Sequence, residues 1–270
     1  MSIVLLTHAG GSPGVTTTSL AMALRWPSEV LLADCDPHAN QTILAGYLEA
    51  QPTSGVGLAS FAAAARAHLL RPDQLREDAL ALPGAASNAM FYPGFSHPSS
   101  ASIFAPLWPD MAEQFRSLAA SGTDVLVDIG RLTSDPPAGS LVGVADEILF
   151  VVRSGLPSLA VTRIWRQHLQ ECVQNTKPGL RISLVVVGPG RPYTAREISQ
   201  QFDIPLRGEI AWEPKDAEAL HEGKPLRAGF ERRPLARSAE QLAHQLRDQS
   251  TLASIGFKRA FVPAGSGDAS

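Results

Sequence analysis

The sequence predicts an α/β fold: a doubly wound, mostly parallel β-sheet with helices on both faces. Short apolar segments recur along the chain at intervals that leave room for one helix between successive strands. Most of these segments are continuously apolar rather than alternating, which is typical of strands that are buried on both faces. Several end in a carboxylate or a glycine, and ligands of such sheets bind outside the carboxyl ends of the strands. We therefore expect a binding crevice at that edge.

The composition is that of a globular protein. Among 270 residues, 44% are hydrophobic and 18% are charged, and the net charge is -3. These values exclude a disordered chain and argue against a protein dedicated to coating nucleic acid. Two cysteines cannot build a disulfide framework, no signal peptide is expected, and no apolar run is long enough to span a bilayer. We expect a cytoplasmic protein with a single domain over residues 1–250 and a tail over 251–270.

The first forty residues have the form of a phosphate-binding βαβ unit. Strands are expected over 3–6 and 30–33, and a helix over 16–26. Glycines allow the backbone between the first strand and the helix to wrap an anion, and the helix N-terminus offers free N–H groups. This turn has the sequence Gly10-Gly11-Ser12-Pro13-Gly14-Val15-Thr16-Thr17, and the second strand runs into Asp34-Cys35-Asp36.

The remaining elements follow from the same alternation. Further strands are expected over 89–92, 124–130, 147–152, 181–187 and 205–210. Further helices are expected over 40–48, 56–70, 71–80, from about Asp110, and over 157–173, 193–201 and 234–249. The late start near Asp110 is expected because three prolines precede it. Asp128 and Gly188-Pro189-Gly190 lie at strand ends and should join the glycine turn at one edge of the sheet.

Several segments resemble the ParA/MinD family of deviant-Walker-A P-loop ATPases. Residues 11–18 occupy the place of the family's Gly-Gly-Val-Gly-Lys-Thr-Thr loop, and residues 30–40 match its Asp-x-Asp-Pro-x-x-Asn switch I segment. Residues 124–128 match the Walker B strand, with Gly130 at the start of switch II, and residues 204–225 are similar to a late strand, turn and Gly-x-Pro of the family. The resemblance covers nearly the whole chain. It implies a P-loop NTPase fold of the SIMIBI type with ATP and Mg²⁺ as ligands.

The resemblance also implies roles for individual residues. Asp36 would be catalytic and would orient the attacking water. Thr16, Asp34 and Asp128 would form the magnesium site. The segment from Gly188 to Arg191 would lie against the base. The implied nucleotide-binding residues are Gly10, Gly11, Ser12, Gly14, Val15, Thr16, Thr17, Gly188 and Pro189.

Two departures from the family pattern put ATP hydrolysis in question. The signature lysine of the family would fall at Gly10 and its second lysine at Val15, and Pro13 removes one N–H donor from the loop. Phosphoryl transfer depends on electrostatic stabilisation of the γ-phosphate. Loss of one positive partner costs about 2–5 kcal/mol, or more than tenfold in triphosphate binding. Arg131 and Arg153 follow neighbouring strands and are the candidates for a substitute cation.

Two function classes remain open. The first is a degenerate, CpaE/TadZ-like protein with little or no ATP hydrolysis, which positions or assembles a partner such as pilus or secretion machinery. The second is a slow ATPase of the partitioning type, which cycles between monomer and ATP dimer on DNA or membrane. A dinucleotide site using Asp34 is a weaker alternative, because the loop lacks Gly-x-Gly-x-x-Gly. The plainest alternative is a tight turn that binds no ligand.

Other features have both a structural and a functional interpretation. The cations Lys224, Arg227, Arg232, Arg233, Arg237 and Arg247 form either a solvated face or a surface for non-specific DNA. The segment Leu252–Val262 is either a packed terminus or an amphipathic membrane contact, and disorder is expected over 263–270. Peripheral association with membrane or nucleoid and a homodimer are compatible with both function classes. We expect His8, Cys35, Trp108, Trp165 and Trp212 to be packing residues, the tryptophans in the core or at an interface.

Overall fold

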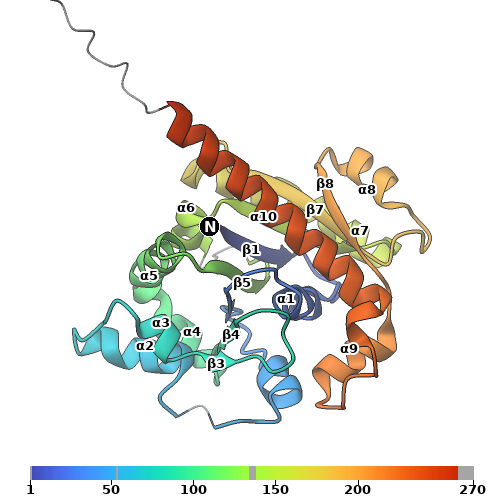
Figure 1. Cartoon of the computed structure of the whole chain (residues 1–270). Helices are drawn as coiled ribbons and strands as arrows, with labels where there is room; N and C mark the ends of the chain where they lie inside the picture. Colours follow the sequence, from blue (N-terminus) through green and yellow to red (C-terminus); the bar gives the residue numbers. More distant parts are fainter. Residues whose placement is uncertain (1, 53, 134–137, 261–270) are drawn as a thin grey trace, which may run out of the picture.

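A computed structural model describes residues 2–52, 54–133 and 138–260 of the chain (Figure 1). Its centre is an eight-stranded sheet in the order β3-β4-β2-β5-β1-β6-β7-β8. All neighbouring strands are parallel except the pair β3 and β4, which is antiparallel. The strands are β1 (Ile3–His8), β2 (Val30–Asp34), β3 (Leu80–Ala81), β4 (Ala89–Tyr92), β5 (Asp124–Arg131), β6 (Glu147–Arg153), β7 (Arg181–Val187) and β8 (Leu206–Ile210). The predicted doubly wound sheet is confirmed.

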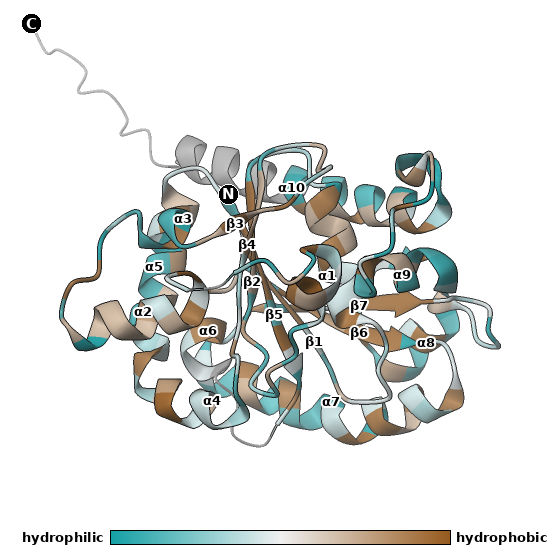
Figure 2. Ribbon diagram, turned by 90° about the horizontal axis from the view of Figure 1, so that it is seen from below, coloured by the Kyte–Doolittle hydropathy of each residue, from teal (hydrophilic) through white to brown (hydrophobic). Residues whose placement is uncertain are grey.

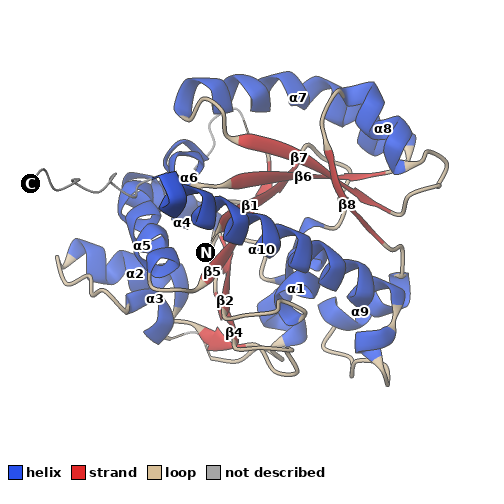
Figure 3. Ribbon diagram, turned by 45° about the horizontal axis from the view of Figure 1, so that its top comes forward, coloured by secondary structure: helices blue, strands red, loops and turns tan. Residues whose placement is uncertain are grey.

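Helices cover both faces of the sheet (Figure 3). One face carries α1 (Val15–Leu24), the π-helix η1 (Ile43–Tyr47), α9 (Pro214–His221) and α10 (Pro234–Ala260). The other face carries α2 (Gly57–Arg66), α3 (Gln74–Glu77), α4 (Pro98–Phe104), α5 (Trp108–Ala120), α6 (Ala138–Val144), α7 (Leu156–Thr176) and α8 (Ala195–Phe202). Two short 3₁₀ helices, η2 (Ala105–Leu107) and η3 (Phe230–Arg232), complete the described elements.

The continuously apolar strands serve two hydrophobic cores. Successive side chains of a strand point to opposite faces. In β1, Ile3 and Leu5 therefore belong to the core under α5 to α8, whereas Val4 and Leu6 belong to the core under α1 and α10. Figure 2 shows brown, apolar strands between helices whose outer faces are more polar. No helix within the described residues combines the length and apolar character that a bilayer crossing requires.

Several predicted element bounds are wrong, for identifiable reasons. The helix expected from about Asp110 is preceded by α4 and η2, because Pro98, Pro106 and Pro109 each occupy a first-turn position, where a missing N–H costs nothing. The helix expected over 71–80 is only α3, and Leu80 pairs with Phe91 in the sheet instead.

Other elements were not expected at all or extend further than expected. The helices α6 and α9 had no counterpart among the expected elements. The segment expected to be helical over 40–48 forms the π-helix η1. The last helix was expected to end at Gln249, but α10 continues to Ala260, into the predicted tail. The predicted disorder over 263–270 lies outside the described residues, and the division into domain and tail stays a prediction.

Candidate functional site

The glycine turn after β1 adopts a conformation that depends on its glycines. Gly11 and Gly14 have φ angles of 74° and 93°, in the left-handed region that favours glycine. Gly14 is the N-cap of α1, and its carbonyl accepts a hydrogen bond from the Thr18 N–H at 2.9 Å. No side chain caps this helix. The sequence Gly10–Thr17 therefore forms the expected turn from strand to helix, and the first N–H groups of α1 face the carboxyl edge of the sheet.

Neither position at which the family carries lysine holds a cation in this structure. A Cβ at Gly10 would lie 3.1 Å from Val161 Cγ1 of α7, which is tighter than ordinary packing. Val15 is 4% exposed and belongs to the hydrophobic core under α1 and α10. The residues that replace the lysines therefore pack closely against neighbouring side chains.

Three aspartates meet at the same edge. Asp34 and Asp128 are direct neighbours in the parallel pairing of β2 with β5. Asp34 Oδ1 accepts a hydrogen bond from the Asp36 N–H at 3.1 Å, and Asp128 Oδ1 accepts one from the Gly130 N–H at 2.9 Å. The Asp36 carboxylate lies against Gly130, where any Cβ would overlap it. Asp36 also accepts a hydrogen bond from the His38 N–H at 2.9 Å.

Burial without a cationic partner raises the pKa of two of these acids. Desolvation raises the pKa of Asp128 to about 6, although hydrogen bonds from Gly130, Thr16 and Ser19 oppose the shift. Desolvation and the neighbouring Asp128 charge raise the pKa of Asp34 well above its usual range. Both effects disfavour the ionised form. The crevice thus contains carboxyl groups whose full ionisation would be stabilised by a bound cation.

The oxygen atoms at this edge suit a magnesium ion. Proteins bind Mg²⁺ through one or two carboxylates together with phosphates and water. Thr16 Oγ1 accepts a hydrogen bond from Asn40 Nδ2 at 3.2 Å, and the Thr16 hydroxyl is hydrogen-bonded to Asp128. Thr16 and Asp128 would hold the ion, which would neutralise phosphate charge when bound. Across the described residues, no three His, Cys, Asp or Glu side chains form a metal-binding group, so phosphates and water would have to complete the shell.

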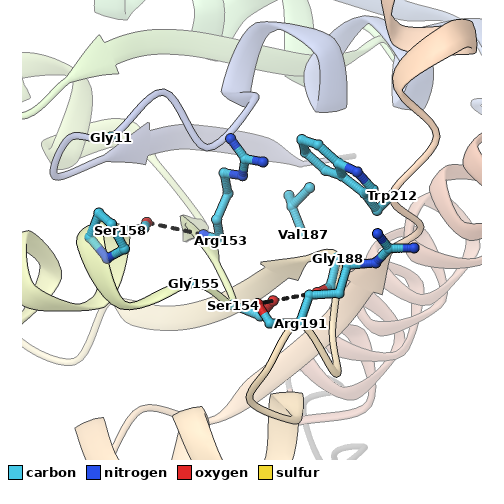
Figure 4. A pocket seen from close by; sticks show the side chains of 10 residues that line it. Gly11, Arg153, Ser154, Gly155, Ser158, Val187, Gly188, Arg191 and Trp212 are labelled. Atoms are coloured by element: carbon cyan, nitrogen blue, oxygen red, sulfur yellow. Dashed lines mark hydrogen bonds between the residues drawn. The ribbon is translucent and has the colours of Figure 1, made fainter.

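A cavity of about 380 Å³ extends from the glycine turn towards the ends of β7 and β8 (Figure 4). Gly11 of the turn and Ser158 of α7 line one end, and Gly188 and Trp212 line the other. A Cβ at Gly188 would lie 3.2 Å from Trp212 Cβ, so glycine is needed for this close approach. The hydroxyl of Ser154 donates hydrogen bonds to the carbonyls of Gly188 and Arg191, the latter at 2.9 Å. The expected base-side segment therefore faces the phosphate turn across one cavity.

The two candidate cations lie in different places. Arg131 Nε donates to the carbonyl of Ala9 at 3.2 Å, and the side chain lies over Gly10. Arg153 lines the cavity, with its guanidinium carbon 4.0 Å from the centre of the Trp212 ring. Of these two candidates, Arg153 therefore reaches the space between the glycine turn and the segment expected to lie against a base.

The packing predictions hold for most of the singled-out residues. Cys35 is fully buried, and burial raises the pKa of its thiol, as expected of a structural cysteine. Trp108 is in the core, and Trp165 packs edge-on against His168. Burial lowers the pKa of His8, and its buried Nδ1 has no hydrogen-bond partner among the described residues. Trp212 packs against the core under α1 and α10 and also lines the cavity.

The predicted cationic surface is largely neutralised by its own chain. Lys224 pairs with Glu218 and Glu222, and Arg233 pairs with Asp216. Arg227, Arg232 and Arg247 also lie near carboxylates, at 3.7, 3.5 and 3.8 Å. These ion pairs weaken the interpretation of Lys224–Arg247 as a DNA surface. The side chains of Leu252–Val262, proposed to contact membrane, lie outside the described residues.

Three functional candidates escaped the sequence interpretation. Ser158 lies outside every motif, and Trp212 lies in the late segment that resembles the family but was expected only to pack; their place in the fold brings both to the cavity. His221, at the end of α9, is hydrogen-bonded through Nε2 to the Thr17 hydroxyl in the first turn of α1. No sequence signal links residues 17 and 221, so this contact could be found only in three dimensions.

Solved structures of MinD and ParA proteins share this fold. A ParA family ATPase from Chlorobium tepidum is 18% identical, with a TM-score of 0.71 over 90% of this chain and 99% of that one. A MinC:MinD cell division complex from Aquifex aeolicus is 17% identical, with a TM-score of 0.67 over 92% and 96%. MinD with Mg-ADP from Pyrococcus horikoshii is 18% identical, with a TM-score of 0.66 over 93% and 98%. No family model and no curated protein matches the sequence. The chain has the P-loop fold of these ATPases.

Proposed function

We propose that this protein is a nucleotide-binding positioning or assembly factor with a ParA/MinD-like fold that hydrolyses ATP very slowly or not at all. The uncharged residues at the two lysine positions carry this proposal. Gly10 lies close to Val161, and Val15 is part of the core, so neither position offers positive charge to a phosphate. The loss of such charge removes most of the stabilisation on which phosphoryl transfer depends.

Nucleotide binding is supported by the parts that remain. The glycine turn keeps its backbone conformation, Thr16 is hydrogen-bonded to Asp128, and a cavity leads from Gly11 to the end of β7. The structural neighbour from Pyrococcus horikoshii was solved with Mg-ADP, which suggests the same ligand class here. Bound nucleotide would then act as a structural ligand that sets the conformation of the crevice loops.

The second candidate function is a slow ATPase of the partitioning type. It is favoured by one observation, the position of Asp36 against Gly130 at the edge where a γ-phosphate would lie. Such an enzyme would need a cation from elsewhere in the chain. Under this alternative, the protein would cycle between monomer and ATP dimer on DNA or membrane.

Phosphate release from Mg-ATP separates the two candidates. We expect the purified protein to release phosphate no faster than its Asp36→Ala variant, because the crevice lacks the charge to stabilise the transition state. Nucleotide binding, measured by calorimetry with ADP, should persist in both proteins. Turnover that the Asp36→Ala substitution abolishes would reject the assembly-factor proposal in favour of the ATPase.

Partners and location follow from the same proposal. The neighbouring MinD from Aquifex aeolicus was solved in complex with MinC, which supports a protein partner here, such as a component of pilus or secretion machinery. Without a lysine that reaches across a dimer, any homodimer should form without ATP. Light scattering should therefore give the same mass with and without ATP. A cytoplasmic location, peripheral to membrane or nucleoid, belongs to this proposal.

A further inference from the structure

The cavity between the glycine turn and β7 contains two arginines, of which only Arg153 was a candidate cation from the sequence. Arg153 and Arg191 both line it, together with the indole of Trp212 (Figure 4). Within the described residues, no carboxylate forms an ion pair with either guanidinium group. Most of the cations between Lys224 and Arg247, in contrast, are paired with acids of the chain. The cavity therefore offers both positive charge and an aromatic surface, which suits a ligand with a negatively charged group and an aromatic ring.

The position of Arg153 connects it to the phosphate turn. Arg153 is the last residue of β6, and its backbone N–H donates to the Ser158 hydroxyl at 3.1 Å. Ser158 in turn packs against the turn, since a Cβ at Gly11 would lie 3.4 Å from Ser158 Cα. Arg153 is thus fixed at its backbone next to Gly11, while its side chain extends into the cavity.

The side-chain contact of Arg153 is one that a phosphate can replace. Its guanidinium group lies 4.0 Å from the centre of the Trp212 ring. A cation–π contact at a partly exposed site stabilises less than a charge-assisted hydrogen bond. Arginine also binds phosphate through two parallel N–H bonds. A phosphate in the cavity would therefore draw the guanidinium group away from the indole or bind it in place.

Arg131 is less suited to this role. Its Nε is already bonded to the Ala9 carbonyl, and Arg131 is not among the residues that line the cavity. The positive end of the α7 dipole adds to the charge at the cavity, because Gly155, the N-cap of α7, and Ser158 in its first turn both line it.

We propose that Arg153 binds the phosphate groups of a nucleotide and supplies the positive charge that the glycine turn lacks. This inference rests on the proposed nucleotide binding and adds the residue that neutralises the ligand. Arg191 contributes charge at the base side of the same cavity. Trp212 forms the aromatic wall and reports on occupancy, because ligand binding changes the surroundings of its indole.

The test is calorimetric titration of the full-length protein with Mg-ADP and with AMP. Arg153→Gln should weaken ADP binding by about ten- to a hundredfold, the equivalent of one lost charge-assisted bond. The loss should be smaller for AMP, which carries fewer phosphates. Arg163→Gln, an exposed arginine on α7 outside the cavity, is the matched control and should leave both affinities unchanged. Arg153→Lys keeps the positive charge and should retain part of the affinity for ADP. This second variant keeps the test valid if the glutamine variant does not fold.

Each outcome bears on a separate statement. If wild-type protein binds neither nucleotide, the proposed nucleotide-binding function fails and this inference fails with it. If wild-type protein binds ADP and Arg153→Gln matches Arg163→Gln, only the role of Arg153 is overturned. An equal loss for ADP and AMP would also overturn it, since that pattern indicates a structural role. Quenching of tryptophan fluorescence by ADP in wild type, absent from Trp212→Phe, would support the assignment to this cavity.

Discussion

Asp124 and Asp216 are as deeply buried as Asp34 and Asp128, but their surroundings differ. Asp124 accepts hydrogen bonds from Ser2 N–H, Trp26 Nε1 and Ser28 Oγ at 2.8, 2.9 and 3.0 Å. Arg233 Nε lies 2.8 and 2.6 Å from the two oxygens of Asp216.

Among the described residues, the crevice acids Asp34 and Asp128 have no such cation. Their neighbours are backbone N–H groups, hydroxyl groups and other carboxylates, and the pKa of each is raised by burial. Buried acids that hold a fold together are neutralised by the chain itself, because an unpaired buried charge is costly. Acids left without a partner at a strand edge are available to a ligand. The contrast therefore separates structural carboxylates from those of a binding site.

The largest expected effect concerns the structural side of this contrast. Arg233→Ala should lower the free energy of unfolding by about 3 kcal/mol, because it leaves the buried Asp216 carboxylate with only the more distant Arg227, at 3.7 Å, as a cationic partner. Denaturation by urea measures the change. The neighbouring Arg232, with a side chain that is 86% exposed, is the control, and its alanine variant should lie within about 0.5 kcal/mol of wild type. If both alanine variants lose a similar amount of free energy of unfolding, the Arg233–Asp216 pair is not the special structural contact described here.

Removing the charge of the crevice acid Asp128 should raise the stability of the protein, whereas removing Arg233 lowers it. Because the folded-state pKa of Asp128 is about 6, above its value of 3.8 in the unfolded chain, the folded protein binds more protons between these values. Stability should therefore fall as pH rises through this window, by about 3 kcal/mol from this group. Asp128→Asn should be more stable than wild type at pH 8 and should show less of this pH dependence. Urea unfolding at pH 4.5 and pH 8 tests both statements, and a destabilised asparagine variant would contradict them.

A smaller effect is expected where the chain makes room for Asp34. A Cβ at Gly94 would lie 2.6 Å from Asp34 Cγ and 2.8 Å from its backbone oxygen. Gly94→Ala should lower stability by about 2 kcal/mol through overpacking. Gly139, with open space at its Cβ position, is the matched control, and its alanine variant should be neutral or slightly stabilised. Equal melting temperatures for the two variants would show that the loop around Gly94 can shift to accommodate a Cβ next to Asp34.

The smallest effect expected is on ligand affinity. Val15→Lys should raise the affinity for ADP by about tenfold, or 1.4 kcal/mol, if the turn keeps its shape when it binds phosphate. The ligand-free variant should melt at a lower temperature than wild type, because Val15 is part of the core. Calorimetry with ADP gives the affinity, and Val15→Met serves as a control of similar length without charge. No gain over that control would indicate that the turn does not hold phosphate.

Much of the fold could be predicted because its signals are local. Continuously apolar segments identified most of the described strands, whereas β8, with the sequence Leu-Arg-Gly-Glu-Ile, was expected from its place in the alternation. β3 was missed because two residues, Leu80 and Ala81, give no periodic pattern. The meeting of the glycine turn with Asp36 and Asp128 could also be predicted, since all follow parallel strands. The same rule placed Gly188 at the crevice.

The rest of the site depended on packing between elements that are distant in sequence. Val161 closes the space at Gly10, and Trp212 stacks with Arg153, but neither pair shares a spacing or a motif. The neutralisation of Arg233 by Asp216 was missed for the same reason, because α9 was not expected as a helix. Side-chain partners across such distances become visible only once the elements are placed.

The contact between Val161 and Gly10 has a consequence for any attempt to convert this protein into an efficient hydrolase. Lysine introduced at position 10 would bring its own Cβ to 3.1 Å from a methyl group of Val161, so the valine side chain or the turn would have to shift slightly. A smaller residue at position 161 would relieve this contact. Lysine at position 10 should therefore be tolerated better when position 161 is made smaller at the same time.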